Sequence, residues 1–450
     1  MEIQLEHEIE KGSFVVVCGK TGSGKSTLLR QIYKKYENSA MLVSQNPDNQ
    51  IVTDTVYKEL TFGLSNIGYD DKKIKTRVAE TASYFSISHL FGKSTDSLSG
   101  GEKQILNLAC AMTLNPDILL LDEPVSMLDP VMATRLVDMI KNINREYLKT
   151  IVIAEHRLDD LFGFADRVIV VDDKKICFDA PPSEAAAYMA DNNLEKLLPV
   201  YSRINAGRKP IPVTLNDARQ MASCGVYEKE KPVVHEEVFI SAKNLDYFYN
   251  SKQGFVLNDF SMDFYKNRVH VLVGENGSGK STFARVLSKY LKPYSGKIKP
   301  KNYSVGYLSQ NVTDHFIIDE YEKTHPYDLS YGEQQRLAFN LVIKNKPDLL
   351  ILDEPTKGLD EYEKNDLINT INEYKKVATV LIISHDLQFC AEIADYITMI
   401  SNGKNVFFGK PEEFFEENVF YTTPVCRIFK DKCAGIISEK DLREWNRQKQ

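Results

Sequence analysis

The chain has 450 residues, a formal net charge of −7 and an apolar fraction of 43%. This length predicts two or three domains, and the mildly acidic charge excludes a broad basic surface for nucleic acid or anionic lipid. No apolar run approaches the roughly 20 residues that a membrane-spanning helix needs. The seven cysteines are scattered without a CxxC pair, which fits reduced thiols and excludes a metal site of that spacing.

The first predicted elements are a short apolar strand over 14–18 and then a helix. The helix is indicated by apolar side chains at helical spacing, namely Leu28, Leu29, Ile32, Tyr33 and Tyr36. Between the two elements stands GKTGSGKST, a phosphate-binding loop in its required context of strand before and helix after. Glycines let the backbone N–H groups turn toward phosphate oxygens, and the helix N-terminus adds a favourable dipole.

The loop therefore predicts a nucleotide site, with the Lys25 ammonium on the β- and γ-phosphates and the Ser26 hydroxyl on Mg²⁺. The predicted phosphate-binding residues are Gly19, Lys20, Thr21, Gly22, Ser23, Gly24, Lys25, Ser26 and Thr27.

An unbroken apolar run at 118–121 follows downstream, as expected for a parallel strand buried on both faces. Asp122 and Glu123 come at its end. The aspartate suits the shell of Mg²⁺, which prefers one or two carboxylates plus water. The glutamate suits a general base that orients the attacking water. A DEP segment alone is equally well a polar strand exit, but the phosphate loop about 100 residues upstream favours catalysis.

The second half of the chain repeats these segments in the same order. GENGSGKST follows an apolar strand at 269–273, LSYGE corresponds to LSGGE, and LLILDEPTKGLD corresponds to ILLLDEPVSMLD. Asp353 and Glu354 repeat the carboxylate pair after the apolar run 349–352. The helix predicted after the second loop carries Phe283, Val286, Leu287, Tyr290 and Leu291. The second set of phosphate-binding residues is Gly274, Glu275, Asn276, Gly277, Ser278, Gly279, Lys280, Ser281 and Thr282.

The repeat predicts two α/β P-loop domains in tandem, each a parallel sheet wrapped by helices. We expect a first domain at 1–190, its tail and a linker at 191–237, a second domain at 238–415 and a second tail at 416–450. The two tails share a weak similarity that begins with PVYSR in the first and PVCRI in the second. A stretch rich in proline, lysine and glutamate near 228–237 is typical of a linker.

LSGGE ahead of LLLDEP resembles the signature and Walker B strand of ABC ATPases, and the resemblance covers nearly the whole chain. It implies two RecA-like cores, each with a helical signature subdomain, that pair head to tail within the chain around two ATP molecules. Lys25 would then face the signature of the second copy, and Lys280 that of the first. The signature residues implied to contact ATP are Ser99, Gly100, Gly101, Ser330 and Gly332.

The same resemblance assigns the remaining roles in each site. It places Asp129 and Asp360 in the cross-domain loops. The implied catalytic residues are the water-orienting Glu123 and Glu354, the γ-phosphate switches His156 and His385, and the Mg²⁺-sensing Gln45 and Gln310. The implied Mg²⁺ ligands are Ser26, Gln45, Asp122, Ser281, Gln310 and Asp353. Tyr249 stands where an aromatic stacks on adenine in the second copy, and the first copy has no equivalent, because only eighteen residues precede Gly19.

A narrower similarity begins at Gln45. SQNPDNQIVTDTVYKELTFGL resembles the energy-coupling factor transporters, which import vitamins and metal ions with separate ATPase, coupling and substrate-binding subunits. In that family an NPDNQ-type segment shapes a groove for a helix of the coupling protein. Val56, Leu60 and Leu64 lie on one helical stripe, which either lines this groove or packs on its own domain; we expect the groove. Gln45 precedes Ser99 by 54 residues, whereas Gln310 precedes Ser330 by only 20, so the second helical subdomain is expected to be reduced.

These features predict an Mg²⁺-dependent ATPase that is peripheral on the cytoplasmic face of the cell membrane. It would power import of a small solute, binding a transmembrane coupling subunit and, through it, a membrane substrate-binding subunit, with no nucleic-acid partner. The alternative is a soluble tandem ABC ATPase that acts on the ribosome. Proteins of that kind carry a long charged inter-domain linker or iron–sulfur cysteines, which this sequence lacks.

Overall fold

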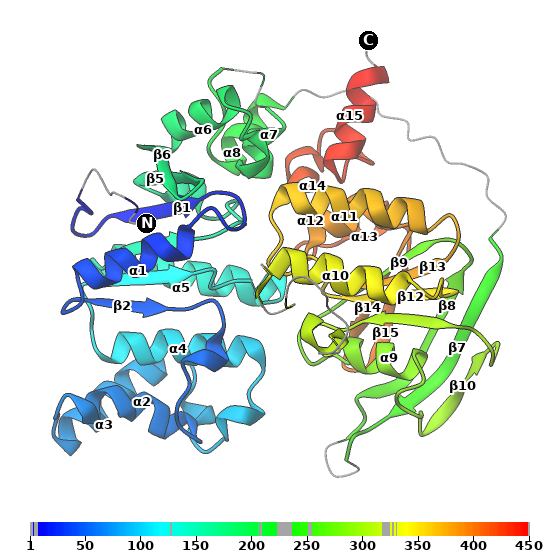
Figure 1. Ribbon diagram of the computed structural model, residues 1–450, viewed down its shortest axis with the longest axis horizontal. Coiled ribbons are helices and arrows are strands. Elements are labelled where there is room, and N and C mark those ends of the chain that lie inside the picture. The colour runs from blue at the N-terminus through cyan, green and yellow to red at the C-terminus, as the bar shows by residue number, and fades with distance from the viewer. Residues whose placement is uncertain are drawn as a thin grey trace. The chain divides into compact units, whose positions relative to one another are not determined.

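The computed structural model describes residues 3, 8–126, 128–205, 207, 209–222, 236–250, 254–316, 325, 328–329 and 331–448. The chain divides into two compact units, Met1–Thr214 and Leu215–Gln450 (Figure 1). Most of the stretch expected to be a linker, 228–235, lies outside the described residues, as does Ser330. Each unit is described by itself below.

Unit 1 is built on a six-stranded sheet with the order β2-β3-β4-β1-β5-β6. All neighbours are parallel except β5 and β6, which form an antiparallel pair. The strands are β1 (Phe14–Cys18), β2 (Ala40–Val43), β3 (Ile118–Asp122), β4 (Thr150–Ala154), β5 (Arg167–Asp172) and β6 (Lys175–Ala180). Every residue of β1, β3 and β4 is buried, because helices cover both faces of a parallel sheet. The strands predicted at 14–18 and 118–121 are confirmed.

Helix α1 (Lys25–Lys35) starts directly after the first phosphate loop and packs on β3 and β4. Its inward side chains Leu28, Leu29 and Ile32 share one core with alternate residues of the strands. Helix α4 (Gly100–Thr113) carries the first signature at its start, and α5 (Pro130–Tyr147) packs on β4. The helix predicted after the first loop is thereby confirmed, with Tyr36 at its C-cap.

Helices α2 (Val56–Asn66) and α3 (Asp71–Tyr84) lie on the far side of α4 from the strands and form a helical subdomain with it (Figure 1). Three short 3₁₀ turns connect this region: η1 (Pro47–Asn49), η2 (Ser88–Leu90) and η3 (Thr95–Ser97). Val56, Leu60 and Leu64 are fully buried. The expectation that this stripe lines a docking groove is wrong, because these three side chains pack inside the subdomain and are not accessible to a partner.

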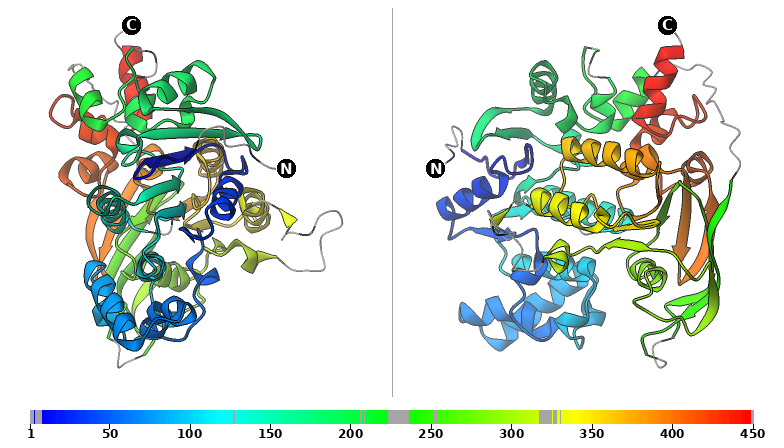
Figure 2. Two further views of the ribbon diagram at one scale, coloured as in Figure 1. Left: turned by 90° about the vertical axis from the view of Figure 1, so that its left-hand side faces the viewer. Right: turned by 45° about the vertical axis from the view of Figure 1, so that its right-hand side comes forward.

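Unit 2 repeats the sheet of unit 1 in the order β11-β12-β13-β9-β14-β15, with the same single antiparallel pair at its end. The strands are β9 (Val269–Val273), β11 (Val305–Leu308), β12 (Leu349–Asp353), β13 (Thr379–Ile383), β14 (Tyr396–Ser401) and β15 (Lys404–Gly409). A three-stranded antiparallel sheet adds β7 (Val238–Tyr247) between β8 (Leu257–Tyr265) and β10 (Ser295–Lys299). Figure 2 shows the long strands β7 and β8 beside the main sheet of this unit, where β8 contacts β15.

Four helices of unit 2 lie between or directly after the strands of its main sheet: α9 (Lys280–Leu287), α10 (Tyr331–Ile343), α11 (Glu361–Tyr374) and α12 (Leu387–Ile393). Helix α9 ends at Leu287, so Tyr290 and Leu291 lie beyond it and the longer prediction is wrong. Lys289 adopts a left-handed backbone with φ 63°, which turns the chain out of the helix. The helical spacing of apolar residues therefore predicted a helix that extends beyond its actual end at Leu287.

Each unit also contains shorter helices and 3₁₀ turns. In unit 1 these are η4 (Phe162–Phe164), α6 (Pro182–Asp191), η5 (Glu195–Leu197) and α7 (Val200–Arg203). In unit 2 they are η6 (Val312–His315), α13 (Pro411–Glu417), α14 (Pro424–Phe429), α15 (Glu439–Gln448) and α8 (Leu215–Met221), which packs on α14. Among the described residues, no helix has the length and apolar character needed to cross a membrane.

Candidate functional site

The two phosphate loops have matching geometry at the carboxyl ends of β1 and β9. Lys25 is buried, and its Nζ donates to the carbonyl oxygens of Gly19 at 3.0 Å and Lys20 at 3.1 Å. Lys280 is also buried, and its Nζ donates to the carbonyl oxygens of Gly274 at 2.8 Å and Glu275 at 2.9 Å. Both lysines thus lie folded over a loop whose following helix starts at the lysine itself.

Only glycine fits at the first position of each loop. A Cβ on Gly19 would lie 2.1 Å from the carbonyl oxygen of Val171, and one on Gly274 would lie 2.2 Å from that of Ile400. Within each loop the buried hydroxyls of Ser23 and Ser278 find no hydrogen-bond partner among the described residues. Buried polar atoms are normally paired, so an orphan at the same place in both loops fits a ligand with acceptor oxygens.

The serine at the start of each helix reaches the aspartate at the end of β3 or β12, which lies two strands away from the strand before the loop. Ser26 hydrogen-bonds to Asp122, and Ser281 hydrogen-bonds to Asp353. Burial raises the pKa of both aspartates above its usual value, against the lowering effect of these hydroxyls. The Oδ1 atom of Asp122 is buried and finds no partner among the described residues. A hydroxyl beside a carboxylate with a spare oxygen fits Mg²⁺, a cation that selects oxygen ligands.

In unit 1 the structure brings three predicted catalytic side chains together. The carboxylate of Glu123 accepts from Gln45 Nε2 at 2.6 Å on one oxygen and lies 2.9 Å from His156 Nε2 on the other. Lys25 Nζ is 3.2 Å from the same ring nitrogen. Burial raises the pKa of Glu123, but the hydrogen bond and charge of His156 and the charge of Lys25 outweigh it and lower the pKa. Glu123 has φ 46°, a costly backbone conformation that is typical of functional sites.

In unit 2 the corresponding group is arranged differently. One oxygen of Glu354 accepts from the backbone N–H of His385 at 3.2 Å, and the other lies 3.3 Å from the ring Nε2 of the same residue. Burial and the neighbouring Asp353 raise the pKa of Glu354. Glu354 repeats the left-handed backbone with φ 53°. Gln310 is exposed two residues beyond β11. The two predicted bases therefore have different surroundings.

The signature and cross-domain residues lie at helix N-termini. Ser99 caps α4, accepting from Glu102 N at 3.3 Å, while the Glu102 carboxylate accepts from Ser99 N at 2.8 Å. Gly100 and Gly101 form the first turn of α4. Asp129 caps α5, and Asp360 caps α11. Because helix N-termini attract anions, the exposed start of α4 is suited to a phosphate.

In the second copy, the signature residue Gly332 lies in the first turn of α10. A Cβ on Gly332 would lie 2.4 Å from the Glu363 carboxylate of α11, so a larger residue here would displace the end of that side chain.

Tyr249, the predicted adenine-stacking residue, follows β7 and is half exposed. Its hydroxyl lies 3.2 Å from Thr282 Oγ1 in the first turn of α9, so the tyrosine stands beside the second phosphate loop. Sequence reasoning missed a neighbour: Tyr307 of β11 donates to Asp353 at 3.1 Å and also hydrogen-bonds to Arg285. The first copy has Leu42 at this place in the sheet, so this support for the aspartate exists in unit 2 alone.

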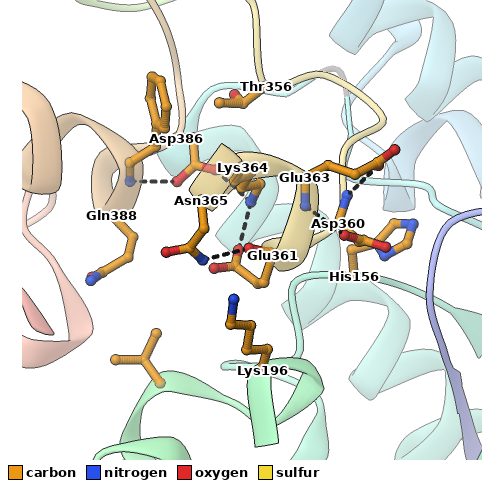
Figure 3. Close-up of polar contacts among 12 residues, drawn as sticks. His156, Lys196, Thr356, Asp360, Glu361, Glu363, Lys364, Asn365, Asp386 and Gln388 are labelled. Atoms are coloured by element: carbon orange, nitrogen blue, oxygen red, sulfur yellow. Dashed lines mark hydrogen bonds and ion pairs between the residues drawn. The ribbon is translucent and has the colours of Figure 1, made fainter. Parts of the chain in front are cut away.

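A second missed group lies at the start of α11. Lys364 is 7% exposed, and its Nζ contacts Glu361 Oε1 at 2.8 Å and Asp386 Oδ2 at 2.6 Å (Figure 3). Burial disfavours the charged lysine, but the two carboxylates outweigh this and raise its pKa. Asp386 directly follows the switch residue His385, and Asp360 begins the same helix as Lys364. The lysine thus joins the switch loop to the first turn of α11 within unit 2.

Comparison with known proteins decides the family. The family model described as ABC transporter matches residues 4–126, 257–315 and 307–357. A putative ABC transporter ATP-binding protein of Bacillus thuringiensis is 32% identical, covering 98% of this chain and 95% of the relative. The chain belongs to the ABC transporter ATP-binding family. Its tandem α/β domains therefore bind and hydrolyse ATP, as its ABC motifs predicted.

Two further similar proteins have names that point to different roles, one to import and the other to the ribosome. A putative HMP/thiamine import ATP-binding protein of Bacillus subtilis is 27% identical to this ABC protein, covering 92% of the chain and 89% of the relative. The archaeal ribosome recycling factor, solved in complex with a ribosomal stalk protein, has a TM-score of 0.61 at 19% identity. It covers 91% of this chain and 88% of the solved chain. At this identity the likeness shows the tandem ABC fold and nothing further.

Proposed function

We propose that this ABC ATPase powers import of a small solute, a vitamin or a metal ion, through a transporter of the energy-coupling factor type. In each copy the phosphate loop holds ATP, and the paired serine and aspartate hold Mg²⁺, which supplies positive charge to the phosphate oxygens. Glu123 and Glu354 orient the attacking water, and His156 and His385 contact the γ-phosphate. The two copies act as a head-to-tail pair at the cytoplasmic face of the membrane.

The observation that carries the transport proposal is a rigid segment after Gln45 in unit 1. The amide of Gln50 accepts from Ser44 N at 2.8 Å and donates to Leu42 O at 2.9 Å, which ties the segment to β2. On the other side, Asn107 of the signature helix α4 donates to Pro47 O at 3.0 Å. Hydrogen bonds therefore hold the NPDNQ segment to both the sheet and α4. A segment held in this way can transmit the movement of a bound coupling helix to the ATPase domain.

Beside this segment, α2 and the residues that flank it carry apolar side chains that the subdomain does not bury. Tyr57 is 37% exposed and Phe62 is 46% exposed, with Val52 before the helix and Ile67 after it exposed still further. A partner helix that covers such side chains gains affinity by burying them. This exposed set replaces the buried stripe as the proposed contact of the transmembrane coupling subunit. The import relative of Bacillus subtilis supports the same role.

Photocrosslinking in membranes tests the proposal. A photoreactive phenylalanine analogue at Tyr57 or Phe62 is expected to join the chain to a multi-span membrane protein. The same analogue at Tyr147, an exposed aromatic of α5, is the matched control and is expected to give no such product. Equal crosslinking from Tyr147, or crosslinks to ribosomal proteins instead, would contradict the proposal. The membrane substrate-binding subunit that co-purifies with the adduct then identifies the solute.

A further inference from the structure

The two copies differ at the residue before the switch histidine. The repeat aligns Ala154-Glu155-His156 with Ile383-Ser384-His385, so a glutamate in unit 1 stands where unit 2 has a serine. Glu155 is 2% exposed, and neither the catalytic roles above nor the phosphate loop uses it. A buried carboxylate is costly unless hydrogen bonds satisfy it, so its contacts indicate its task.

Both oxygens of Glu155 accept backbone N–H groups. Oε1 accepts from Val125 N at 3.1 Å, and Oε2 accepts from His156 N at 3.1 Å. Val125 belongs to the loop that follows Glu123, and His156 begins the switch loop. Glu155 therefore bridges the loop of the predicted base and the loop of the predicted switch, through the main chain of both.

Unit 2 bridges the same loops more weakly. The hydroxyls of Thr356 and Ser384, at the places of Val125 and Glu155, lie 3.4 Å apart. The N–H of His385 then goes to the catalytic carboxylate itself, at 3.2 Å from Glu354 Oε2. The base of unit 2 thus uses one oxygen to hold its own switch loop.

In unit 1 the corresponding oxygen, Oε2 of Glu123, does not accept the N–H of the switch histidine. Because Glu155 takes the N–H of His156, Oε2 of Glu123 instead accepts from Gln45 at 2.6 Å, and Oε1 faces the His156 ring at 2.9 Å. The glutamine lies at the end of β2, on the opposite side of Glu123 from the switch histidine in the strand order. The carboxylate is held from two sides by side chains rather than turned toward its own loop.

We propose that Glu155 is a positioning residue for hydrolysis in the first copy: it occupies the switch-loop N–H so that Glu123 is preset between Gln45 and His156. In the copy that contains Lys25, the base is then already directed at the attacking water. In the other copy, Glu354 must first break its hydrogen bond to the N–H of His385. The inference concerns the ATPase reaction and the predicted role of Glu123, and it does not depend on import.

The test uses the full chain with Glu354→Gln, so that turnover reports on the first copy. Glu155→Ala is expected to lower kcat about tenfold or more, because a base displaced by a fraction of an ångström loses much of its effect. Affinity for ATP is expected to stay within about twofold, since the two hydrogen bonds of the Glu155 side chain go to Val125 and His156 and not to the phosphate loop. Glu155→Gln keeps one acceptor oxygen and is expected to lose less than Glu155→Ala.

The matched control is Asp159→Ala. Asp159 is a partly buried carboxylate of the same segment, but it accepts the N–H of Val200 at 2.9 Å instead of that of the switch histidine. It is expected to lower thermal stability without lowering kcat. Equal losses of kcat in the Glu155 and Asp159 variants would show a merely structural role and overturn the proposal. An unchanged kcat in Glu155→Ala, or a Gln variant as slow as the Ala variant, would do the same.

If Glu155→Ala does not fold, Glu155→Ser takes its place, because serine is the residue with which the second copy folds at this position. It is expected to slow turnover as the alanine variant would, and a normal kcat would overturn the proposal. Ser384→Ala with Glu123→Gln is the counterpart in the second copy. Its turnover is expected to change by less than about twofold, since Glu354 already holds the His385 N–H.

Discussion

Replacing Lys364 by methionine should strongly destabilise unit 2. The substitution keeps the length of the side chain but removes the cation that Glu361 and Asp386 share. Removing one partner of a buried ion pair costs about 3–5 kcal/mol, because the remaining charge is left unpaired away from water. With an m-value of about 2–3 kcal/mol per molar urea for a unit of this size, the midpoint should fall by about 1–2.5 M.

The chain itself supplies the probe. Trp445 is the single tryptophan of the sequence, and it is buried in unit 2 with its ring 6.1 Å from that of Phe429. Its fluorescence during urea denaturation therefore follows the unfolding of this unit, which matters because a two-domain chain need not unfold in one step. The measured quantity is the shift of the fluorescence midpoint relative to the unsubstituted chain.

Two further variants separate the buried pair from a general effect of losing charge. Lys376→Met removes an exposed lysine from a surface pair with Glu373 and should change stability by less than about 1 kcal/mol. Asp386→Asn, combined with Lys364→Met, neutralises the stranded carboxylate and should recover part of the loss, since asparagine still caps α12. A Lys364→Met midpoint within about 0.3 M of the parent chain would refute the reasoning.

Three other outcomes are expected. Glu123→Gln with Glu354→Gln should bind ATP yet release no phosphate, and a normal rate of phosphate release would contradict the assignment of both bases. Lys280→Ala, which leaves the Lys25 site, should bind ATP about tenfold more weakly than Lys25→Ala does, because stacking on an aromatic contributes ~1–3 kcal/mol; equal affinities in a nucleotide titration would exclude this. His270 is buried in β9, and burial lowers its pKa from 6.5 to about 4. The unfolded chain therefore binds an extra proton between these values, so stability is lost as the pH falls from 6.5 to 4, by about 3 kcal/mol at most. His270→Phe should flatten this dependence in urea titrations at several pH values, and an unaltered slope would contradict it.

The repeated motifs let the sequence predict much of the fold and the candidate residues of both sites. Strands over 14–18 and 269–273 could be placed because a short, mainly apolar run ends in a glycine-rich loop, and a buried parallel strand favours that pattern. The order of the phosphate loop, signature and DEP segment then indicated the ABC family. Each of these features depends on residues that are contiguous in the sequence.

Other features depended on contacts that the sequence does not state. The stripe Val56, Leu60 and Leu64 has the same spacing whether it faces a partner or its own subdomain, and packing against α3 and α4 decided for the core. The use of Glu155 was hidden for a similar reason: its two hydrogen bonds go to main-chain groups, which every residue carries.

What the sequence determined by itself is the pair of α/β domains and the motif residues, because phosphate and metal chemistry requires particular side chains at short spacings. Which carboxylate meets which partner was decided by tertiary structure alone. Lys364 and Asp386 are 22 residues apart in the sequence, and they meet only because α11 packs against α12, which Asp386 caps. Side chains brought together across a sheet leave no periodic trace along the chain, since their contact depends on the packing of elements rather than on neighbouring residues.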